Sequence, residues 1–471
     1  MAAPGVEFPI TTLEILSGTL PQGLRGSLYR NGPARLERGG IKVGHWFDGD
    51  GAVLAVHFDN DGASATYRYV QTQGLRAEAE AGRFLYGNYG MTAPGPIWNQ
   101  WRRPLKNAAN TSVRALPDRL LALWEGGQPH ALDLDSLDTL GLDDLDGTLN
   151  DASSPIGETP YSAHPKCDPI TGELFNFGVE IIGRHAKLRL YRSDPKGRVM
   201  RAAEHRLDGL PLIHDFVLAG PWLVFLVPPV RINLLPILLG VSSFCDAMRW
   251  RPKVGVQLLV FDRDTLELIA RNDIEAGYQW HFGNGAAMDD RRLTLDYARY
   301  PDFSTNRHLR EVPSGRTQTP ARATLWRLTL DARTGQIHEH EQVCDRSLEF
   351  PMVAPSETGQ PWTRTYISVH LPDTDPTAER YDGIACFDHA SGRLIEADTG
   401  GGRYPSEPIL AADAEAGGQR HWLLTLVYDG HAHASELWVF DAGRLDAGPT
   451  CVLGLPEVVP LGFHGCWNPA R

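Results

Sequence analysis

The stretch Phe261-Asp262-Arg263-Asp264-Thr265-Leu266 joins two runs of apolar residues through a short polar turn. Asp, Thr and Gly are typical of tight turns, because Asp and Thr side chains hydrogen-bond the turn backbone and Gly leaves φ unrestricted. The apolar runs on either side have the length and composition of strands. This stretch therefore predicts a β-hairpin.

The same pattern recurs along the chain at a mean spacing of about 64 residues. Its seven copies cover residues 57–62, 132–137, 191–197, 261–266, 330–335, 387–392 and 440–444. Seven equivalent units that fill nearly the whole chain are typical of a β-propeller. Each unit is longer than four strands require, so additional loops must be inserted at the blade ends. The sequence predicts an all-β fold: a seven-bladed β-propeller with loops and short helices forming a cap over one face, in a single domain of residues 1–471.

The composition is that of a folded, acidic protein. Lys and Arg number 45 against 58 Asp and Glu, a formal charge of −13, so we expect no nucleic-acid partner. Hydrophobic residues make up 42% of the chain and charged residues 22%, which excludes a wholly disordered protein. The 48 Gly and 34 Pro are dispersed, which favours many short strands over long helices.

Cysteine usage and the first residues both predict a cytoplasmic protein. The six cysteines form no CxxC pair and no disulfide framework, so we expect reduced thiols. The first residues, MAAPGVE, lack the basic segment and apolar run of a signal peptide. The most apolar region, residues 217–245, is interrupted by Pro221, Pro228, Pro229 and Pro236, so we do not expect it to form a membrane-spanning helix.

Histidines are the candidate metal ligands, because 4 of the 17 lie in apolar or small-residue surroundings. These are His164, His214, His281 and His464, and each belongs to a different repeat unit. A single buried histidine usually satisfies itself with a backbone hydrogen bond, whereas four on a propeller axis would form a metal site. Neutral imidazoles suit Fe, Cu, Zn or Ni, and a set without thiolates argues against a structural zinc site. The HxH pairs at 338–340 and 431–433 lie beside charged or turn residues, so we expect them to be exposed.

Nine short motifs, distributed from residue 28 to residue 465, carry a resemblance to a known family. They are LYRNGP (28–33), HWFDGDG (45–51), ANT (109–111), LWEGG (123–127), SAHP (162–165), IHD (213–215), EFP (349–351), SEP (406–408) and GFHG (462–465). In these motifs and their order the sequence resembles the carotenoid cleavage oxygenase family, whose bacterial members include apocarotenoid oxygenases and lignostilbene dioxygenases. The resemblance implies a seven-bladed propeller with a non-haem Fe(2+) on its axis.

Carried over motif by motif, the resemblance implies that the iron ligands are His164, His214, His281 and His464, with no carboxylate ligand. His281 is the loosest match, because its motif lacks the acidic residue that often follows. Glu125, Glu349 and Glu407 would each accept the N–H of one liganding imidazole, which leaves His164 without such a partner. For Glu407, next to Pro408, an exposed turn is the alternative.

The resemblance also implies residues that shape the space around the metal. Thr111, in the ANT motif, would lie near an open iron position and restrict what binds there. Trp124 and Phe350 would line the substrate tunnel, although ordinary core packing is the alternative for both. The apolar run 228–240 is similar to the patch by which apocarotenoid oxygenases contact a bilayer, with an internal packed helix as the alternative.

The implied function is cleavage of a conjugated C=C double bond of an apocarotenoid with O2, giving two aldehyde or ketone products. The substrate would be a small apolar conjugated molecule, and no protein partner is implied. Cleavage of a stilbenoid is the alternative within the same chemistry, although Trp124 stands where some stilbenoid-cleaving relatives carry Lys. A non-catalytic propeller that binds a ligand or partner is a further alternative. We expect a cytoplasmic protein with peripheral membrane contact through residues 228–240.

Overall fold

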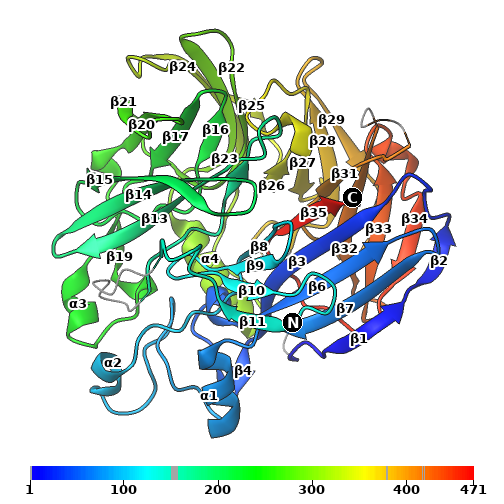
Figure 1. The fold of residues 1–471 in the computed structure, drawn as a ribbon, viewed down its shortest axis with the longest axis horizontal. Helices are drawn as coiled ribbons and strands as arrows, with labels where there is room; N and C mark the ends of the chain where they lie inside the picture. Colours follow the sequence, from blue (N-terminus) through cyan, green and yellow to red (C-terminus); the bar gives the residue numbers. More distant parts are fainter. Residues whose placement is uncertain (1–2, 150–157, 378–379, 416, 418–419, 471) are drawn as a thin grey trace.

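Seven antiparallel sheets of four to six strands form the body of the computed structural model, which describes residues 3–149, 158–377, 380–415, 417 and 420–470. Figure 1 shows them following one another around a ring, so that the blue N-terminal blade lies beside the red C-terminal blade. The prediction of a seven-bladed β-propeller is confirmed.

The blades follow the order of the chain, and the strands of each are given in their order across the sheet. The first blade contains β35 (Gly465–Pro469), β3 (Gly26–Arg35), β6 (Asp50–Phe58), β7 (Ala63–Tyr69) and β1 (Phe8–Thr12). The second contains β8 (Ser112–Ala115), β9 (Leu120–Leu123), β10 (His130–Leu132) and β11 (Thr139–Leu142). The third contains β12 (Lys166–Cys167), β13 (Leu174–Ile182), β14 (His185–Ser193) and β15 (Val199–Leu207). The fourth contains β16 (Val217–Ala219), β17 (Trp222–Val227), β20 (Val256–Asp262) and β21 (Leu268–Ile274).

The remaining three blades have the same arrangement. The fifth contains β22 (Tyr278–Ala287), β23 (Arg292–Tyr300), β24 (Thr324–Asp331) and β25 (Ile337–Cys344). The sixth contains β26 (Leu348–Met352), β27 (Arg364–Val369), β28 (Gly383–Asp388) and β29 (Arg393–Ala397). The seventh contains β30 (Arg403–Pro405) and β31 (Ile409–Ala412), which both pair with β32 (His421–Asp429), then β33 (Ala434–Asp441), β34 (Cys451–Gly454) and β2 (Glu14–Gly18).

All seven sequence repeats are hairpins that join two neighbouring strands of one blade, such as β20 and β21. The Asp of each repeat fixes the turn: Asp262 Oδ1 accepts hydrogen bonds from the backbone N–H of Asp264 (2.9 Å) and Thr265 (2.7 Å). Asp331 makes the equivalent bonds to Arg333 and Thr334, both at 2.9 Å. The turn chemistry read from the sequence therefore operates as expected.

Each blade buries both of its faces, because it packs against a neighbour on either side. β17 shows the result: all six of its residues are buried, and its sequence WLVFLV is a continuous apolar run without alternation. Its residues divide between two hydrophobic clusters, with Leu223 and Phe225 packing toward the third blade and Val224 and Leu226 toward the fifth. Burying each such side chain contributes about 1.5–3 kcal/mol, so the interfaces between blades hold the ring together.

Helices and loops inserted between the strands form the cap. The helices are α1 (Gln73–Ala81), α2 (Asn99–Arg102), α3 (Leu234–Leu238) and α4 (Ser304–Glu311), and small strand pairs are β4 (Glu37–Arg38) with β5 (Ile41–Lys42) and β18 (Val230–Ile232) with β19 (Met248–Trp250). α3 lies between β17 and β20 and α4 between β23 and β24. In an antiparallel sheet the end of a second strand lies beside the start of the first, so both insertions lie over the same edge as the starts of β16 and β22. No helix among the described residues is long and apolar enough to cross a membrane.

The ring is closed by strands exchanged between the two ends of the chain. β35 pairs with β3 in the first blade, and β2 pairs with β34 in the seventh. The segment before β35 is held against β3 by backbone bonds from Asn31 N to His464 O (2.8 Å) and from Phe463 N to Asn31 O (2.9 Å). Gly32 permits this approach, because a Cβ there would lie 2.3 Å from the Gly462 Cα.

We expect Gly32→Ala to lower the free energy of unfolding by about 1–3 kcal/mol, because the added methyl group overpacks a backbone crossing. Thermal unfolding monitored by circular dichroism measures the effect. Gly401→Ala is the matched control, since a Cβ there meets nothing within 4 Å and its φ is not positive. Equal unfolding midpoints for the two variants would show that the crossing tolerates a side chain.

Candidate metal centre

Four imidazoles from four different blades converge on the propeller axis. His164 precedes β12, His214 precedes β16, His281 lies in β22 and His464 precedes β35. One ring nitrogen from each lies within 4.8 Å of those of the other three. The side chains of His164, His214 and His464 are at most about a tenth exposed and that of His281 is 12% exposed. The structure therefore brings together all four histidines that the sequence singled out.

The spacing of these nitrogens fits a divalent metal ion. His164 Nε2 lies 3.0 Å from His214 Nε2, which lies 3.3 Å from His281 Nε2. Imidazole nitrogens about 2.1 Å from a metal and at right angles to one another would be separated by roughly 3.0 Å. Burial and the three neighbouring imidazoles also hold the pKa of His164 well below its usual value. Its nitrogens therefore offer a lone pair to a cation at neutral pH.

Three carboxylates set the orientation of three of the rings. The contacts are His214 Nδ1 to Glu125 Oε1 (2.8 Å), His281 Nδ1 to Glu349 Oε2 (2.6 Å) and His464 Nδ1 to Glu407 Oε1 (2.7 Å). A carboxylate at Nδ1 keeps the proton on that nitrogen and leaves the Nε2 lone pair free for a metal. Burial lowers the pKa of His214, but Glu125 outweighs it and raises that pKa. The three glutamates thus lie where the sequence analysis expected them.

Glu407 is held in place from two sides. Gly465 N donates to its Oε2 at 2.9 Å, and Arg30 Nη1 donates to its backbone oxygen at 2.8 Å and lies 3.6 Å from Oε2. The residue is 3% exposed, so the alternative of an exposed turn is wrong. Burial raises the pKa of Glu407 to about 7, against the charge of Arg30. Arg30 lies in the LYRNGP motif, but its partner is 377 residues away and no local pattern identifies the pairing.

His164 differs from the other three, because its Nδ1 lies 4.0 Å from Asp215 Oδ1, beyond hydrogen-bond distance. The buried Asp215 carboxylate instead binds Lys166 Nζ (2.8 Å) and accepts from the backbone N–H groups of Phe216 (2.8 Å) and Phe282 (3.0 Å). Asp215, the residue after His214, is therefore bonded to Phe282, the residue after His281. The sequence analysis assigned no role to Asp215, although it forms part of the IHD motif.

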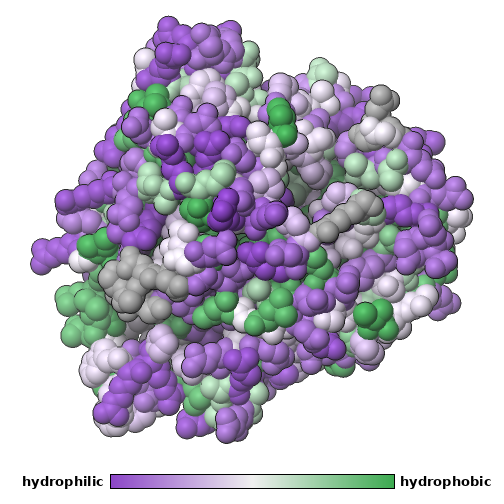
Figure 2. Space-filling model, viewed as in Figure 1, coloured by the Kyte–Doolittle hydropathy of each residue, from purple (hydrophilic) through white to green (hydrophobic). Residues whose placement is uncertain are grey.

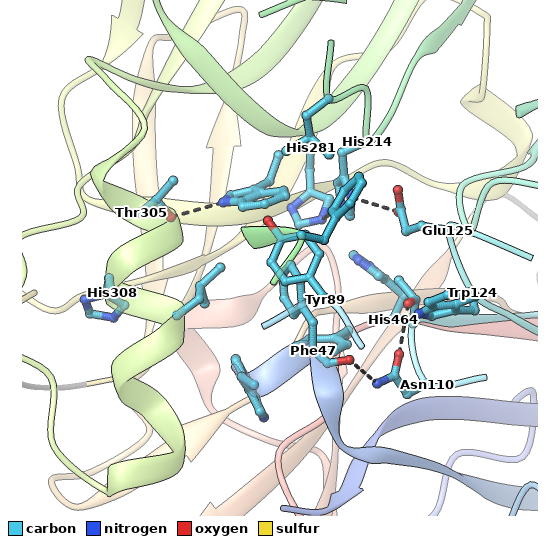
Figure 3. A pocket seen from close by; sticks show the side chains of 18 of the residues that line it. Phe47, Tyr89, Asn110, Trp124, Glu125, His214, His281, Thr305, His308 and His464 are labelled. Carbon is cyan, nitrogen blue, oxygen red and sulfur yellow. Dashed lines mark hydrogen bonds and ion pairs between the residues drawn. The ribbon is translucent and has the colours of Figure 1, made fainter. Parts of the chain in front are cut away.

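A cavity of about 570 Å³ opens onto three of the histidines. Figure 3 shows His214, His281 and His464 directed toward the space that Phe47 and Tyr89 face from the other side. Trp124, Phe350 and Thr111 also line it, so all three lie at the expected place. Aromatic rings dominate the walls: Trp46, Phe47, Tyr89, Trp124, Trp280, Phe350 and Phe463. Such a space suits an apolar ligand.

Two of these wall residues are tightly fixed beside the histidines. Phe350 stacks on His281 with ring centroids 5.2 Å apart and has a positive φ of 55°, an uncommon backbone conformation for a bulky residue. Thr111 donates its hydroxyl to Asn110 Oδ1 (3.2 Å), and Asn110 Nδ2 donates to the backbone oxygens of Phe47 (2.9 Å) and Gly49 (2.7 Å). Both wall residues are therefore held in place by contacts within the protein.

One prediction about the remaining histidines is wrong. His340, in the HxH pair at 338–340, is not exposed: its side chain is 13% accessible, and its Nε2 lies 2.7 Å from the Tyr297 hydroxyl. It packs beside the Trp326 ring at 5.0 Å. The second pair, His431 and His433, is exposed as expected.

Fold and site together define a class of protein: β-propeller oxygenases whose metal centre is a cluster of histidines on the propeller axis. The family model described as "Retinal pigment epithelial membrane protein" matches residues 2–469. The chain therefore belongs to this family, which includes the carotenoid cleavage oxygenases, and it is a carotenoid cleavage dioxygenase-type oxidoreductase.

Individual relatives agree with this assignment. The chain is 33% identical to apocarotenoid-15,15'-oxygenase of Synechocystis sp., with 97% of this chain and 92% of the relative covered. It is 27% identical to resveratrol cleavage oxygenase 1 of Aspergillus fumigatus over 99% and 94% of the two chains. A solved structure of the Synechocystis apocarotenoid oxygenase superposes with a TM-score of 0.88 at 31% identity, covering 99% and 96% of the chains. That oxygenase has also been solved in a cobalt-substituted form, with a TM-score of 0.86.

We expect His464→Ala to remove at least about nine-tenths of the bound metal, because three imidazoles hold a divalent ion far less firmly than four. Metal analysis of the purified protein by plasma mass spectrometry measures this. His431→Ala is the matched control, because this histidine is exposed, does not belong to the cluster, and has its Nε2 at 3.0 Å from the Gly401 backbone oxygen. A variant lacking His464 with a full metal content would mean that the cluster is not the binding site.

Proposed function

We propose that this protein is an Fe(II)-dependent dioxygenase that cleaves one conjugated double bond of an apocarotenoid with O2 to give two aldehyde or ketone products. The observation that carries the proposal is the convergence of four ring nitrogens at the wall of an aromatic cavity. Iron is favoured because imidazole suits Fe(II), and four neutral ligands leave the ion dipositive with two of its six positions free. When bound, ferrous iron supplies the activation of O2 toward an electron-rich alkene.

The residues of this chain would hold the ion, orient its histidine ligands and exclude water from the cavity. Glu125, Glu349 and Glu407 keep the Nδ1 protons of their histidines in place, so that the Nε2 atoms stay directed at the ion. Thr111, fixed by Asn110, stands at the cavity side of the cluster and limits what can approach an open position. The aromatic walls exclude water and bind a flat conjugated chain.

Two observations favour an apocarotenoid over a stilbenoid. The residue before Glu125 is the apolar Trp124, which lines the cavity. The apocarotenoid-named relative is also more similar to this chain than the resveratrol-named one. Stilbenoid cleavage stays the second candidate, because Tyr89 lines the cavity and its hydroxyl, which donates to Asn306 Oδ1 (2.7 Å), has an oxygen able to accept from a phenol.

We expect iron-loaded protein to consume β-apo-carotenals in air and to release two carbonyl fragments. Loss of polyene absorbance and the masses of the products measure the reaction, with a resveratrol-type stilbene tested in parallel. His214→Ala should lose at least about 100-fold of the rate, and His431→Ala should keep it. Cleavage of the stilbene alone would select the second candidate. Binding of polyenes without turnover by iron-loaded protein would favour a non-catalytic binding propeller.

We also propose peripheral membrane contact through an apolar patch made of Leu235, Leu238, Leu239, Val241, Trp98 and Trp101. The side chains of these residues are between 51% and 66% exposed. Figure 2 shows hydrophobic surface at the lower left, where α3 lies in Figure 1. Trp101 Nε1 donates to Leu238 O at 2.8 Å, which joins the two parts of the patch. Exposed contiguous apolar surface suits binding to a lipid interface.

The patch lies at the cavity, because Leu234, Ile237 and Leu238 also line it. A lipid-borne substrate could therefore pass from the interface to the cavity along α3. This placement differs in one respect from the sequence expectation that the whole run 228–240 is a surface: Val230 is fully buried and Leu234 is partly buried.

We expect Leu235→Glu combined with Leu239→Glu to reduce co-sedimentation with phosphatidylcholine liposomes by about tenfold or more, because two charges oppose entry into lipid. Leu140→Glu combined with Ile170→Glu is the matched control, since these leucine and isoleucine side chains are 63% and 77% exposed on other blades. Liposome binding unchanged by the first pair would remove the patch as a membrane contact.

A further inference from the structure

A partly buried positive charge lies at the α4 side of the cavity and is not used by the metal centre. Arg380 lines the cavity together with His308, and its Nη1 lies 3.2 Å from His308 Nε2. Among the described residues, no carboxylate lies within ion-pair distance of Arg380. Burial lowers its pKa, and the guanidinium nevertheless keeps its charge at neutral pH.

His308 is fixed as the neutral acceptor of this pair. Its Nδ1 lies 2.8 Å from the backbone oxygen of Thr319, which can only accept, so Nδ1 carries the proton. Nε2 therefore holds a lone pair and accepts from Arg380. Burial lowers the pKa of His308, and the charge of Arg380 lowers it further, against the hydrogen bond to Thr319. The pair as a whole carries one positive charge, and His308 orients the guanidinium without neutralising it.

A positive charge beside apolar walls is costly unless a ligand oxygen pairs with it. The guanidinium has only N–H donors, so its partner must be a hydrogen-bond acceptor, best an anionic one. The neighbouring walls are apolar or aromatic and include Tyr381, Leu309 and Ala321. The site therefore has the chemistry to bind the oxygenated end of a long apolar molecule.

Two sets of contacts connect this site to the histidine cluster. Thr305 of α4 accepts a hydrogen bond from Trp280 Nε1 at 3.0 Å, and Trp280 precedes His281. A second connection runs through rings: Phe350 stacks on His281 and lies 6.5 Å from Tyr381, the residue after Arg380. Figure 3 shows His308 on α4 across the cavity from Trp124. An oxygen bound at Arg380 would thus place one particular double bond beside the cluster.

We propose that Arg380, oriented by His308, binds the terminal carboxylate or aldehyde oxygen of the polyene and so selects both the substrate and the bond that is cleaved. This inference rests on the proposed function, because it names the end group that the same cavity recognises. It makes Arg380 a specificity residue and His308 a positioning residue.

The test is the binding of three polyenes of equal length that end in a carboxylate, an aldehyde or a hydrocarbon. Tryptophan fluorescence quenching in iron-loaded protein without oxygen measures Kd while preventing turnover, since Trp124 and Trp280 line the cavity. We expect wild type to bind the acid most tightly and the hydrocarbon least. Arg380→Leu should weaken binding of the acid by about 10- to 100-fold, the range for a charge-assisted hydrogen bond, and leave the hydrocarbon within about twofold.

Two further variants show whether a change in affinity comes from the charge of Arg380 or from a general change in the protein. Arg380→Gln retains a donor without charge, so it should lose more affinity for the acid than for the aldehyde. Arg307→Leu is the matched control on the same helix, because its side chain is 79% exposed, and it should bind all three ligands as wild type does. Circular dichroism and unfolding midpoints confirm that each variant is folded.

The outcomes separate this inference from the proposed function. Unchanged acid and aldehyde affinities in folded Arg380→Leu, or equal wild-type affinities for all three polyenes, would overturn the end-group site. Wild-type cleavage in air with that result would leave the proposed function standing. The expected order of affinities without any cleavage in air would support the end-group site and contradict the dioxygenase. If cleavage occurs, a shift in product masses with Arg380→Leu would support control of the bond that is broken.

Discussion

Four ring nitrogens within 4.8 Å of one another are the constraint on which the rest of the structure depends. Lone pairs this close repel each other unless a cation lies between them, so the fold must hold the rings there by other means. It does so by anchoring each ring to a different blade and by fixing three Nδ1 atoms with glutamate carboxylates. The propeller supplies this rigidity, because each blade is packed on both faces and cannot tilt independently.

Ring closure and the metal centre are the same piece of structure. His464 precedes β35, the strand that completes the first blade, and Arg30 of β3 holds Glu407 from the seventh. The carboxylate that orients His464 therefore bridges the first and last blades. A weakness in closure would displace one ligand and its glutamate together, so stability and metal affinity are coupled in this protein more directly than in one with a site on a single sheet.

The sequence predicted what local chemistry determines and missed what distant packing determines. The hairpins were predictable because each Asp bonds the backbone two and three residues ahead, as Asp262 does. The four histidines and three glutamates were found through motifs that lie far apart along the chain. Asp215 and Arg30 were quoted within motifs but received no role, because their partners come from other blades. The charged sequence neighbours of His340 predict an exposed side chain, whereas Tyr297 of β23 and Trp326 of β24 bury it.

The cavity wall is charged at one place and apolar at others, and this difference gives a direction to whatever it binds. Where α3 lines it, leucines continue onto exposed apolar surface, and where α4 lines it, His308 lies beside the charged Arg380. A molecule with one hydrocarbon end and one oxygenated end has a single favourable orientation in such a space, since reversing it would bury the charge against hydrocarbon. Three of the clustered histidines line the same cavity, so orientation determines which carbons reach them. The cavity walls then determine which bond reacts, whereas the histidine cluster determines the type of reaction.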